Sequence, residues 1–440
     1  MDNLYKYLNI YIYIYIYIYI YIYIYIFDSS SKFHSSFKHS YNNTFNNNNN
    51  NNRMTTDLPE VTGSPIWLRK MRTLFRRLDS CGHGYLMIDD LLDIGTTIFN
   101  IYPKMLSYKY DELVKTLVYL WYQVLCTHVS RQLATTMNIN ENTFIDNLLN
   151  AFHNDFYQYF NEKFILPLFV AMDQDDDNYI TSTEFQTLMI AWKSIPKDCE
   201  LLFRYYSDKN NKLNKENFQK IFIDYFMSDN INSNIIKLWG PLINYKRAED
   251  YGPIDCGPVW EGKIRTMYRR LDINETMKLK CHDLLQIGQF LIQRAHLDRR
   301  RADAVMRAML NIWVKFLAID KNGEHLDEIR EIEFVHNMRE MINGEYRHEI
   351  DQFGWTFFKA IEIDNSGFIS QASYRILQEA WHVGRDEAEG MFKILDSDKD
   401  GKISSDEFLT AWNEFFLSED PHSPYRMFFG PVISRPTEAR

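Results

Sequence analysis

Residues 396–407 carry five carboxylates whose spacing could hold one calcium ion. Oxygen-bearing side chains recur at every second position, and Gly401 stands sixth, where the chain must turn sharply. Calcium takes about 6 to 8 oxygen ligands at roughly 2.3 to 2.6 Å, and a twelve-residue loop can arrange them around one centre. The expected ligands are Asp396, Asp398, Asp400, the carbonyl oxygen of Lys402, Ser404 and both carboxylate oxygens of Glu407.

Apolar residues recur at helical spacing on both sides of this loop, which predicts a helix before it and another after it. They are Ala388, Met391, Phe392 and Leu395 before the loop, and Phe408, Ala411, Trp412, Phe415 and Phe416 after it. Ile403, at the eighth position, is expected to point inward, away from the metal. Ligands, turn residue and flanks therefore agree on a helix-loop-helix calcium site.

Residues 173–184 repeat the same ligand rhythm. The expected ligands there are Asp173, Asp175, Asp177, the carbonyl oxygen of Tyr179, Thr181 and Glu184. One departure is Asn178, which stands sixth in place of glycine. Asparagine tolerates the left-handed backbone conformation better than most residues, so we expect the substitution to weaken this site and not to abolish it.

The chain repeats itself at a long period after Met54. The segment Trp67–Asp79, which reads WLRKMRTLFRRLD, returns 193 positions later as Trp260–Asp272, which reads WEGKIRTMYRRLD. We therefore expect an all-α protein with two tandem domains, residues 54–245 and 246–440, each built from four helix-loop-helix units.

Four further loops have lost calcium ligands. Loop 206–217 has Tyr at its first position and Asn at its last. Loop 362–373 has Glu and Ser at those positions but keeps some oxygens, so weak binding there is left open. Loops 79–90 and 272–283 keep an acid at both ends, but Cys81 and His83 in the first, and Asn274 and Thr276 in the second, stand where calcium requires carboxylates.

Two other features of these regions point away from a metal. Cys81 and His83 are too few for a structural zinc site, which takes four ligands. The second unit of each half, around 121–144 and 313–334, has no full ligand set, and Asp320, Asn322 and Glu324 of the second half are a remnant of one.

A loop without metal can still brace a loop that binds one. Such units pack in pairs through a short antiparallel contact at the eighth position, which is apolar in four degenerate loops: Leu86, Leu213, Leu279 and Ile369. We expect loop 173–184 to pair with 206–217, and loop 362–373 to pair with 396–407.

The first 53 residues have an unusual composition, with alternating Ile and Tyr from Ile10 to Ile26 and an Asn run from Asn46 to Asn52. A signal peptide would need a small-residue cleavage site, and a membrane span would place Tyr at the hydrocarbon centre. An aggregation-prone strand is a third interpretation. We favour a fourth interpretation: Tyr-Ile is what a repeated TATATA nucleotide tract would encode. The functional chain would then start at Met54, and residues 1–53 would be either disordered or not translated in the native protein.

Composition limits the function classes. The formal net charge of −10 argues against a nucleic-acid partner, and no membrane partner is expected unless the Tyr-Ile segment is real. The five cysteines are scattered, which is typical of free thiols in a reducing compartment. No GxxxxGK[ST], GxSxG or HExxH motif is present, so an enzyme is not expected.

The chain resembles the EF-hand superfamily and, within it, the invertebrate sarcoplasmic calcium-binding proteins and calexcitins. The resemblance covers Pro65 to about Ile433 as two copies, each with an aromatic-rich first hand that begins Trp-x-x-Lys-Met/Ile-Arg-Thr. It implies compact helical domains that bind Ca²⁺ at the two complete loops, with Mg²⁺ as the alternative ion at the same sites.

The sequence is compatible with two functions, a calcium buffer and a calcium sensor, and in both cases we expect the protein to lie in the cytoplasm. A sensor exposes a Met-rich groove on binding, whereas the methionines here are spread over both halves and are expected to fill cores. The alternative is a calcium-stabilised two-domain scaffold with a protein partner. The basic stretch Arg294–Arg301, in which Arg299–Arg301 are consecutive, is expected to be a solvated helix face and not a docking site.

Overall fold

The structure is a computed structural model that describes residues 61–126, 134, 137–153, 157–194, 196–230, 233–319, 324–364 and 366–432. The Tyr-Ile and Asn-rich segment, with Asp320 and Asn322, lies outside these residues. Apart from Ala134, the described residues belong to one compact unit. None of its helices is both long and apolar enough to span a bilayer.

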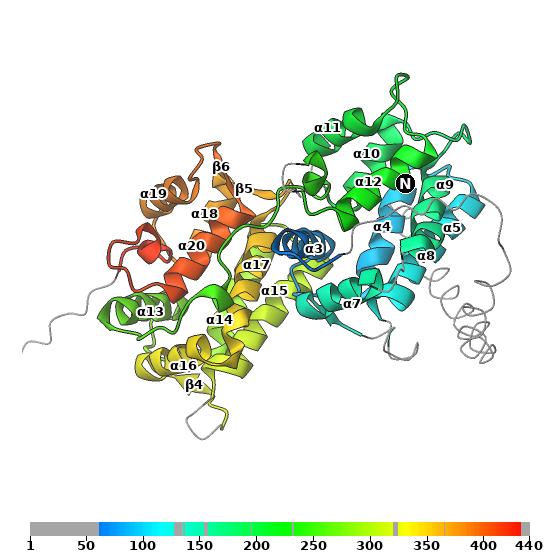
Figure 1. Cartoon of the computed structure of the whole chain (residues 1–440). Helices are drawn as coiled ribbons and strands as arrows, with labels where there is room; N and C mark the ends of the chain where they lie inside the picture. Colours follow the sequence, from blue (N-terminus) through cyan, green and yellow to red (C-terminus); the bar gives the residue numbers. More distant parts are fainter. Residues whose placement is uncertain are drawn as a thin grey trace, which may run out of the picture. The chain divides into compact units, whose positions relative to one another are not determined.

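Helices dominate the described chain, and short strands and turns connect them (Figure 1). In the first half the helices are α3 (Pro65–Leu78), α4 (Ile88–Ile101), α5 (Ser107–Tyr119), α7 (Glu141–His153), α8 (Tyr157–Phe160), α9 (Leu166–Met172), α10 (Ser182–Ala191), α11 (Pro196–Tyr206) and α12 (Lys215–Met227). In the second half they are α13 (Pro258–Leu271), α14 (Cys281–Arg294), α15 (Arg299–Ile312), α16 (Glu331–Asn343), α17 (Glu349–Ile361), α18 (Gln371–Ala380), α19 (Arg385–Leu395) and α20 (Ser405–Leu417).

Shorter elements complete the chain. The π-helical turns are η1 (Leu120–Leu125), η2 (Asn161–Ile165) and η5 (Trp313–Leu317), and the 3-10 turns are η3 (Asn234–Lys237), η4 (Ala248–Asp250), η6 (Glu345–His348) and η7 (Pro424–Met427). The strands are β1 (Tyr85–Leu86), β2 (Ile139–Asn140), β3 (Leu279–Lys280), β4 (Glu328–Ile329), β5 (Phe368–Ser370) and β6 (Lys402–Ser404).

The loops are joined two by two at an apolar residue. Antiparallel contacts pair β1 with β2, β3 with β4, and β5 with β6, while a single bridge joins the third and fourth loops of the first half. The apolar pairs are Leu86 with Ile139, Leu279 with Ile329, Ile369 with Ile403, and Ile180 with Leu213. All eight side chains are buried. The predicted all-α fold of paired helix-loop-helix units is confirmed.

The first helix of each half is anchored on the last helix of the same half. The indole N–H of Trp67 donates to the carbonyl of Phe226 at 2.9 Å, and that of Trp260 donates to the carbonyl of Phe416 at the same distance. Trp67 and Trp260 occupy equivalent positions of the sequence repeat, so both halves close their bundles in the same way.

Loop 79–90 also contacts residues of the second half. The Thr356 hydroxyl donates to the Gly82 carbonyl at 2.6 Å, in a buried position. Arg300 pairs with Asp90, and Arg301 is buried and donates to the Glu362 carbonyl at 3.0 Å. The expectation that Arg299–Arg301 is a solvated face is therefore wrong for Arg300 and Arg301, because both guanidinium groups are bound within the protein.

Candidate metal centre

Loop 396–407 is held between α19 and α20. Asp396 directly follows the last residue of α19, and its backbone N–H still donates to the Phe392 carbonyl at 2.9 Å. Gly401 has a φ of +83°, and a Cβ built there would meet nothing within 4 Å. The backbone conformation, and not a lack of space, is therefore the reason for glycine at this position.

Three carboxylates of this loop converge. Oxygens of Asp396, Asp398 and Asp400 lie within 4.8 Å of one another. Asp396 Oδ2 accepts the Gly401 N–H at 3.1 Å, whereas its Oδ1 is buried and has no hydrogen-bond donor among the described residues. A buried carboxylate oxygen without a partner costs free energy. These residues therefore fit a hard divalent cation, which would remove that cost.

Glu407 closes the loop from the other side and lies in the first turn of α20. Its Oε2 accepts the backbone N–H and the hydroxyl of Ser404, both at 2.9 Å, which forms the capping box of α20. Its Oε1 accepts the Ser397 N–H at 2.8 Å. Burial raises the pKa of Glu407, but the hydrogen bonds from Ser404 and Ser397 outweigh it and hold the pKa below its usual value. Glu407 is therefore an anion at neutral pH.

Loop 173–184 has the same arrangement. Oxygens of Asp173, Asp175 and Asp177 lie within 4.8 Å of one another. Glu184 Oε2 accepts the Thr181 N–H and its Oε1 accepts the Gln174 N–H, each at 2.7 Å. The structure thus brings together the three predicted aspartates of each loop.

The turn of loop 173–184 is made by Asn178. Its φ is +65°, in the same left-handed region as Gly401. Burial raises the pKa of Asp173, although the Asn178 N–H donates to this carboxylate at 2.9 Å. Asparagine therefore performs the turn that the sequence assigned to it.

Two lysines from outside loop 173–184 reach its acids. Lys109 on α5 is buried, donates to the Asp173 carbonyl and pairs with Asp176 at 2.7 Å. Lys212, from the paired loop 206–217, pairs with Asp177. Sequence reasoning missed both residues, and the only signal for Lys212 is its place beside Leu213, the residue that bridges the loops.

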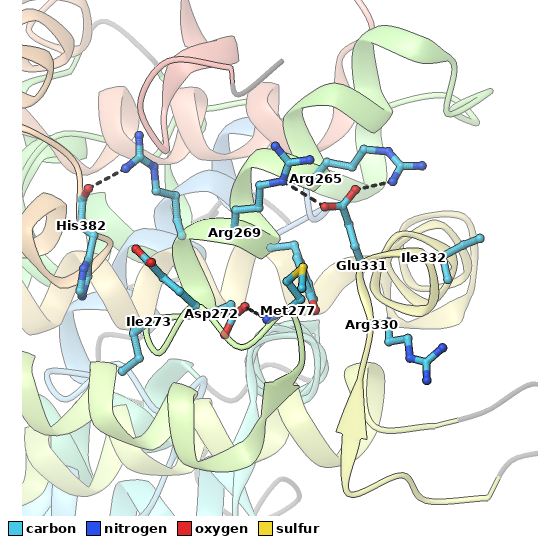
Figure 2. Close-up of a pocket in the computed structure, with 12 residues that line it drawn as sticks. Arg265, Arg269, Asp272, Ile273, Met277, Arg330, Glu331, Ile332 and His382 are labelled. Atoms are coloured by element: carbon cyan, nitrogen blue, oxygen red, sulfur yellow. Dashed lines mark hydrogen bonds and ion pairs between the residues drawn. The ribbon is translucent and has the colours of Figure 1, made fainter. Parts of the chain in front are cut away.

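The degenerate loops use their remaining acids for backbone and arginine contacts. Asp79 accepts the N–H groups of His83 and Gly84, each at 2.8 Å. Figure 2 shows Asp272 accepting the Met277 N–H at 2.7 Å. Within the described chain, clusters of three acids suited to a metal occur in loops 173–184 and 396–407 alone.

A cavity of about 730 Å³ lies beside loop 272–283 and is rich in arginine (Figure 2). Glu331 binds Arg265 at 2.5 Å and Arg269 at 3.0 Å, so much of this positive charge is compensated within the wall. Burial raises the pKa of Glu331, but its hydrogen bonds to the two arginines outweigh this and lower it. The cavity is separate from the two acidic loops.

Two family models match the chain at these loops. One, described as an EF hand domain, matches residues 387–415, and the other, described as an EF hand, matches residues 166–189. Each matched range contains one candidate calcium loop.

Sarcoplasmic calcium-binding proteins are similar to part of the chain. The protein from Perinereis vancaurica tetradentata is 25% identical over 176 residues, which is 40% of this chain and 99% of the relative. The one from Hediste diversicolor is 24% identical over 176 residues, with the same shares. Each relative is thus matched over nearly its whole length by less than half of this chain.

Two solved structures are similar to part of the chain. The coelenterazine-binding protein from Renilla muelleri is 20% identical, with a TM-score of 0.32, and the match covers 40% of this chain and 98% of that one. Calcium-loaded apo-aequorin from Aequorea victoria is 18% identical, with a TM-score of 0.30, and the match covers 38% and 94%.

Proposed function

From the premise that the chain is a calcium-binding EF-hand protein similar to the sarcoplasmic type, we propose that it binds one calcium ion in each half and acts as a calcium buffer in the cytoplasm. The observation that carries the proposal is the buried Oδ1 of Asp396, which has no hydrogen-bond partner within the described chain and lies among three converging carboxylates. The two ligand sets are those predicted for loops 173–184 and 396–407. The tandem arrangement is supported by relatives that match less than half of the chain.

The other loops stabilise the fold in this proposal. Loop 362–373 pairs with loop 396–407 through Ile369, and its first residue, Glu362, is bound by Lys359. The negative charge of Glu362 is therefore already compensated by the Lys359 ammonium group. This favours calcium binding at two loops of the chain and not at a third. When bound, calcium supplies a positive centre that holds the carboxylates of one loop together.

A buffer is favoured over a sensor because most methionines of the described chain lie in the core, although Met277 and Met427 are exposed. Met71, Met189 and Met309 are all buried. A sensor would need an adaptable Met-rich surface that opens on calcium binding. An adaptor function is less favoured, because Arg300 and Arg301 of the basic run are bound within the protein.

Calorimetric titration of the full chain with calcium tests the sites. We expect two bound ions in the wild type and one in each of Glu184→Gln and Glu407→Gln, because a neutral amide cannot chelate calcium as a carboxylate does. Glu216→Gln is the matched control, since Glu216 is exposed in loop 206–217 and is not an expected ligand. If both ligand variants keep the wild-type stoichiometry, the assigned sites are wrong.

Two additional measurements refine the proposal. Titration with magnesium, alone and against calcium, measures competition for the same oxygens. A buffer should give little change in the fluorescence of an apolar-surface dye on calcium binding. A large increase in dye fluorescence would favour the sensor.

A further inference from the structure

The fifth position differs between the two calcium loops. In loop 173–184 it is Asp177, whose Oδ1 accepts the Tyr179 N–H at 2.8 Å and whose Oδ2 pairs with the ammonium group of Lys212. In loop 396–407 it is Asp400, whose Oδ1 accepts the Lys402 N–H at 2.9 Å. Its Oδ2 receives no donor from the described part of the chain. Both aspartates therefore accept a backbone N–H, but only Asp177 also contacts an ammonium group among the described residues.

The difference arises from the partner loops. Lys212 is the seventh residue of loop 206–217, and it precedes Leu213, which bridges to Ile180. This pairing brings the lysine beside the binding loop. The equivalent seventh residue of loop 362–373 is Phe368, a neutral side chain that precedes Ile369 in β5. The two halves therefore provide an internal comparison of a lysine and a phenylalanine at one position.

If only the charges within each loop mattered, loop 173–184 would bind calcium more tightly than loop 396–407. Loop 173–184 contains five carboxylates and no lysine, whereas loop 396–407 contains five carboxylates together with Lys399 and Lys402. Neither of these two lysines forms an ion pair among the residues that the structure describes. In loop 173–184 the positive charges come from elsewhere: Lys109 pairs with Asp176 and Lys212 pairs with the expected ligand Asp177.

We propose that Lys212 is a tethered cation that competes with calcium for Asp177 and makes loop 173–184 the weaker of the two sites. This inference rests on the proposed function. The affinity of such loops depends on the charge of their ligands, and an ammonium group beside Asp177 must be displaced or must remain next to a divalent ion. Lys109 differs, because it holds Asp176 and a backbone carbonyl and no expected ligand carboxylate.

The electrostatic environment agrees with this arrangement. The hydrogen bond from Lys212 lowers the pKa of Asp177, and the same contact raises the pKa of Lys212. The Lys212 ammonium also lies 5.6 Å from the centre of the Tyr179 ring. The pair is partly exposed, with 36% of the Lys212 side chain and 29% of the Asp177 side chain accessible. Lys212 can therefore move away without disturbing the core.

The test measures calcium affinity by calorimetry in the full chain, with Glu407→Gln present so that loop 173–184 binds alone. Adding Lys212→Met should tighten binding about three- to tenfold, since exposed pairs are weak and are screened by salt. Lys212→Arg should keep the wild-type affinity, because the positive charge remains. Lys209→Met is the matched control for net charge, because Lys209 is exposed in the same loop and forms no ion pair within the described chain.

A reciprocal variant tests the effect in the other half. With Glu184→Gln present, Phe368→Lys should weaken binding at loop 396–407 by a similar factor. Helical content by circular dichroism should match the wild type in each variant, since both positions are at the surface or half-buried.

The outcomes separate this inference from the proposed function. If Glu407→Gln protein takes up no calcium with or without Lys212, the proposed site in loop 173–184 fails, and the inference fails with it. If that protein binds calcium and Lys212→Met changes its affinity by less than about twofold, or no more than Lys209→Met does, the inference alone is wrong.

Discussion

A buried lysine recurs at the same place in both halves of the chain. Lys70 on α3 and Lys263 on α13 point to the C-terminal ends of α12 and α20, where carbonyl groups lack helix partners. Lys70 donates to the carbonyls of Tyr225 and Ser228, and Lys263 donates to the Ser418 carbonyl at 2.6 Å. A helix C-terminus attracts positive charge. The lysine of the repeated Trp-x-x-Lys motif is therefore a cap for the last helix of each half.

These lysines should make stability depend on pH. Burial lowers the pKa of both Lys70 and Lys263 to about 8, from 10.5. Between these values the unfolded chain holds more protons on them than the folded chain, so their contribution to the free energy of unfolding rises with pH. In calcium-free urea denaturation, the stability of the wild type relative to Lys70→Met or Lys263→Met should increase from about pH 7 to about pH 10. Lys209→Met should show no such trend, and a constant difference for the buried lysines would contradict the assignment.

At the scale of elements, a calcium-binding loop depends on the degenerate loop paired with it for its stability. Ile369 of loop 362–373 is fully buried against Ile403 of loop 396–407. We expect Ile369→Ala to lower the free energy of unfolding by about 2 to 5 kcal/mol, because it leaves a cavity in the core. It should also weaken calcium binding at loop 396–407, although Ile369 is not a ligand.

Ile363→Ala is the matched control for this prediction. Ile363 lies in the same loop and is 44% exposed, so its loss should change stability by no more than about 0.5 kcal/mol. Urea denaturation and calcium titration with Glu184→Gln present measure both effects. If Ile369→Ala changes stability but leaves the calcium affinity unaltered, the loops are coupled in packing and not in binding.

The sequence predicts the elements best where ligands fix the numbering of a loop. Both calcium loops and their partners were placed from their carboxylates and eighth-position residues, and the observed bridges confirm these pairs. Ile139 and Ile329 were missed, because the second units have no ligand pattern from which to count. The π-helical turns η1 and η5 were also missed, since apolar spacing does not show whether a backbone bond joins residues four or five apart.

Contacts between the two halves could not be predicted from the sequence pattern of either half alone. Arg300 belongs to a run of three arginines, which by itself indicates a solvated surface. In the structure it pairs with Asp90, the last residue of loop 79–90, whose carboxylate is buried. Burial raises the pKa of Asp90 to about 7, while the Arg300 guanidinium lowers it. An arginine of the second half thus binds the acid that would be a bidentate calcium ligand in a complete loop.

At the scale of the whole molecule, these contacts should make both halves unfold together. Besides the Arg300 pair, the Gly82 carbonyl accepts hydrogen bonds from Thr356 at 2.6 Å and Gln352 at 3.1 Å. Each of these hydrogen bonds contributes about 0.5 to 1.5 kcal/mol net, so separating the halves is unfavourable. We therefore expect a single calorimetric transition for the wild type in excess calcium.

Calcium binding gives a direct test of this coupling. An ion that binds only the folded state raises stability by RT ln(1 + [Ca²⁺]/Kd), which is about 2.7 kcal/mol at a concentration 100 times Kd. Glu407→Gln removes that gain in the second half alone. If the halves are coupled, the one transition moves to lower temperature as a whole, and the unfolding of first-half tryptophans such as Trp67 moves with it. Two transitions, of which only one responds to Glu407→Gln, would show that the contacts at Gly82 and Asp90 do not transmit stability between the halves.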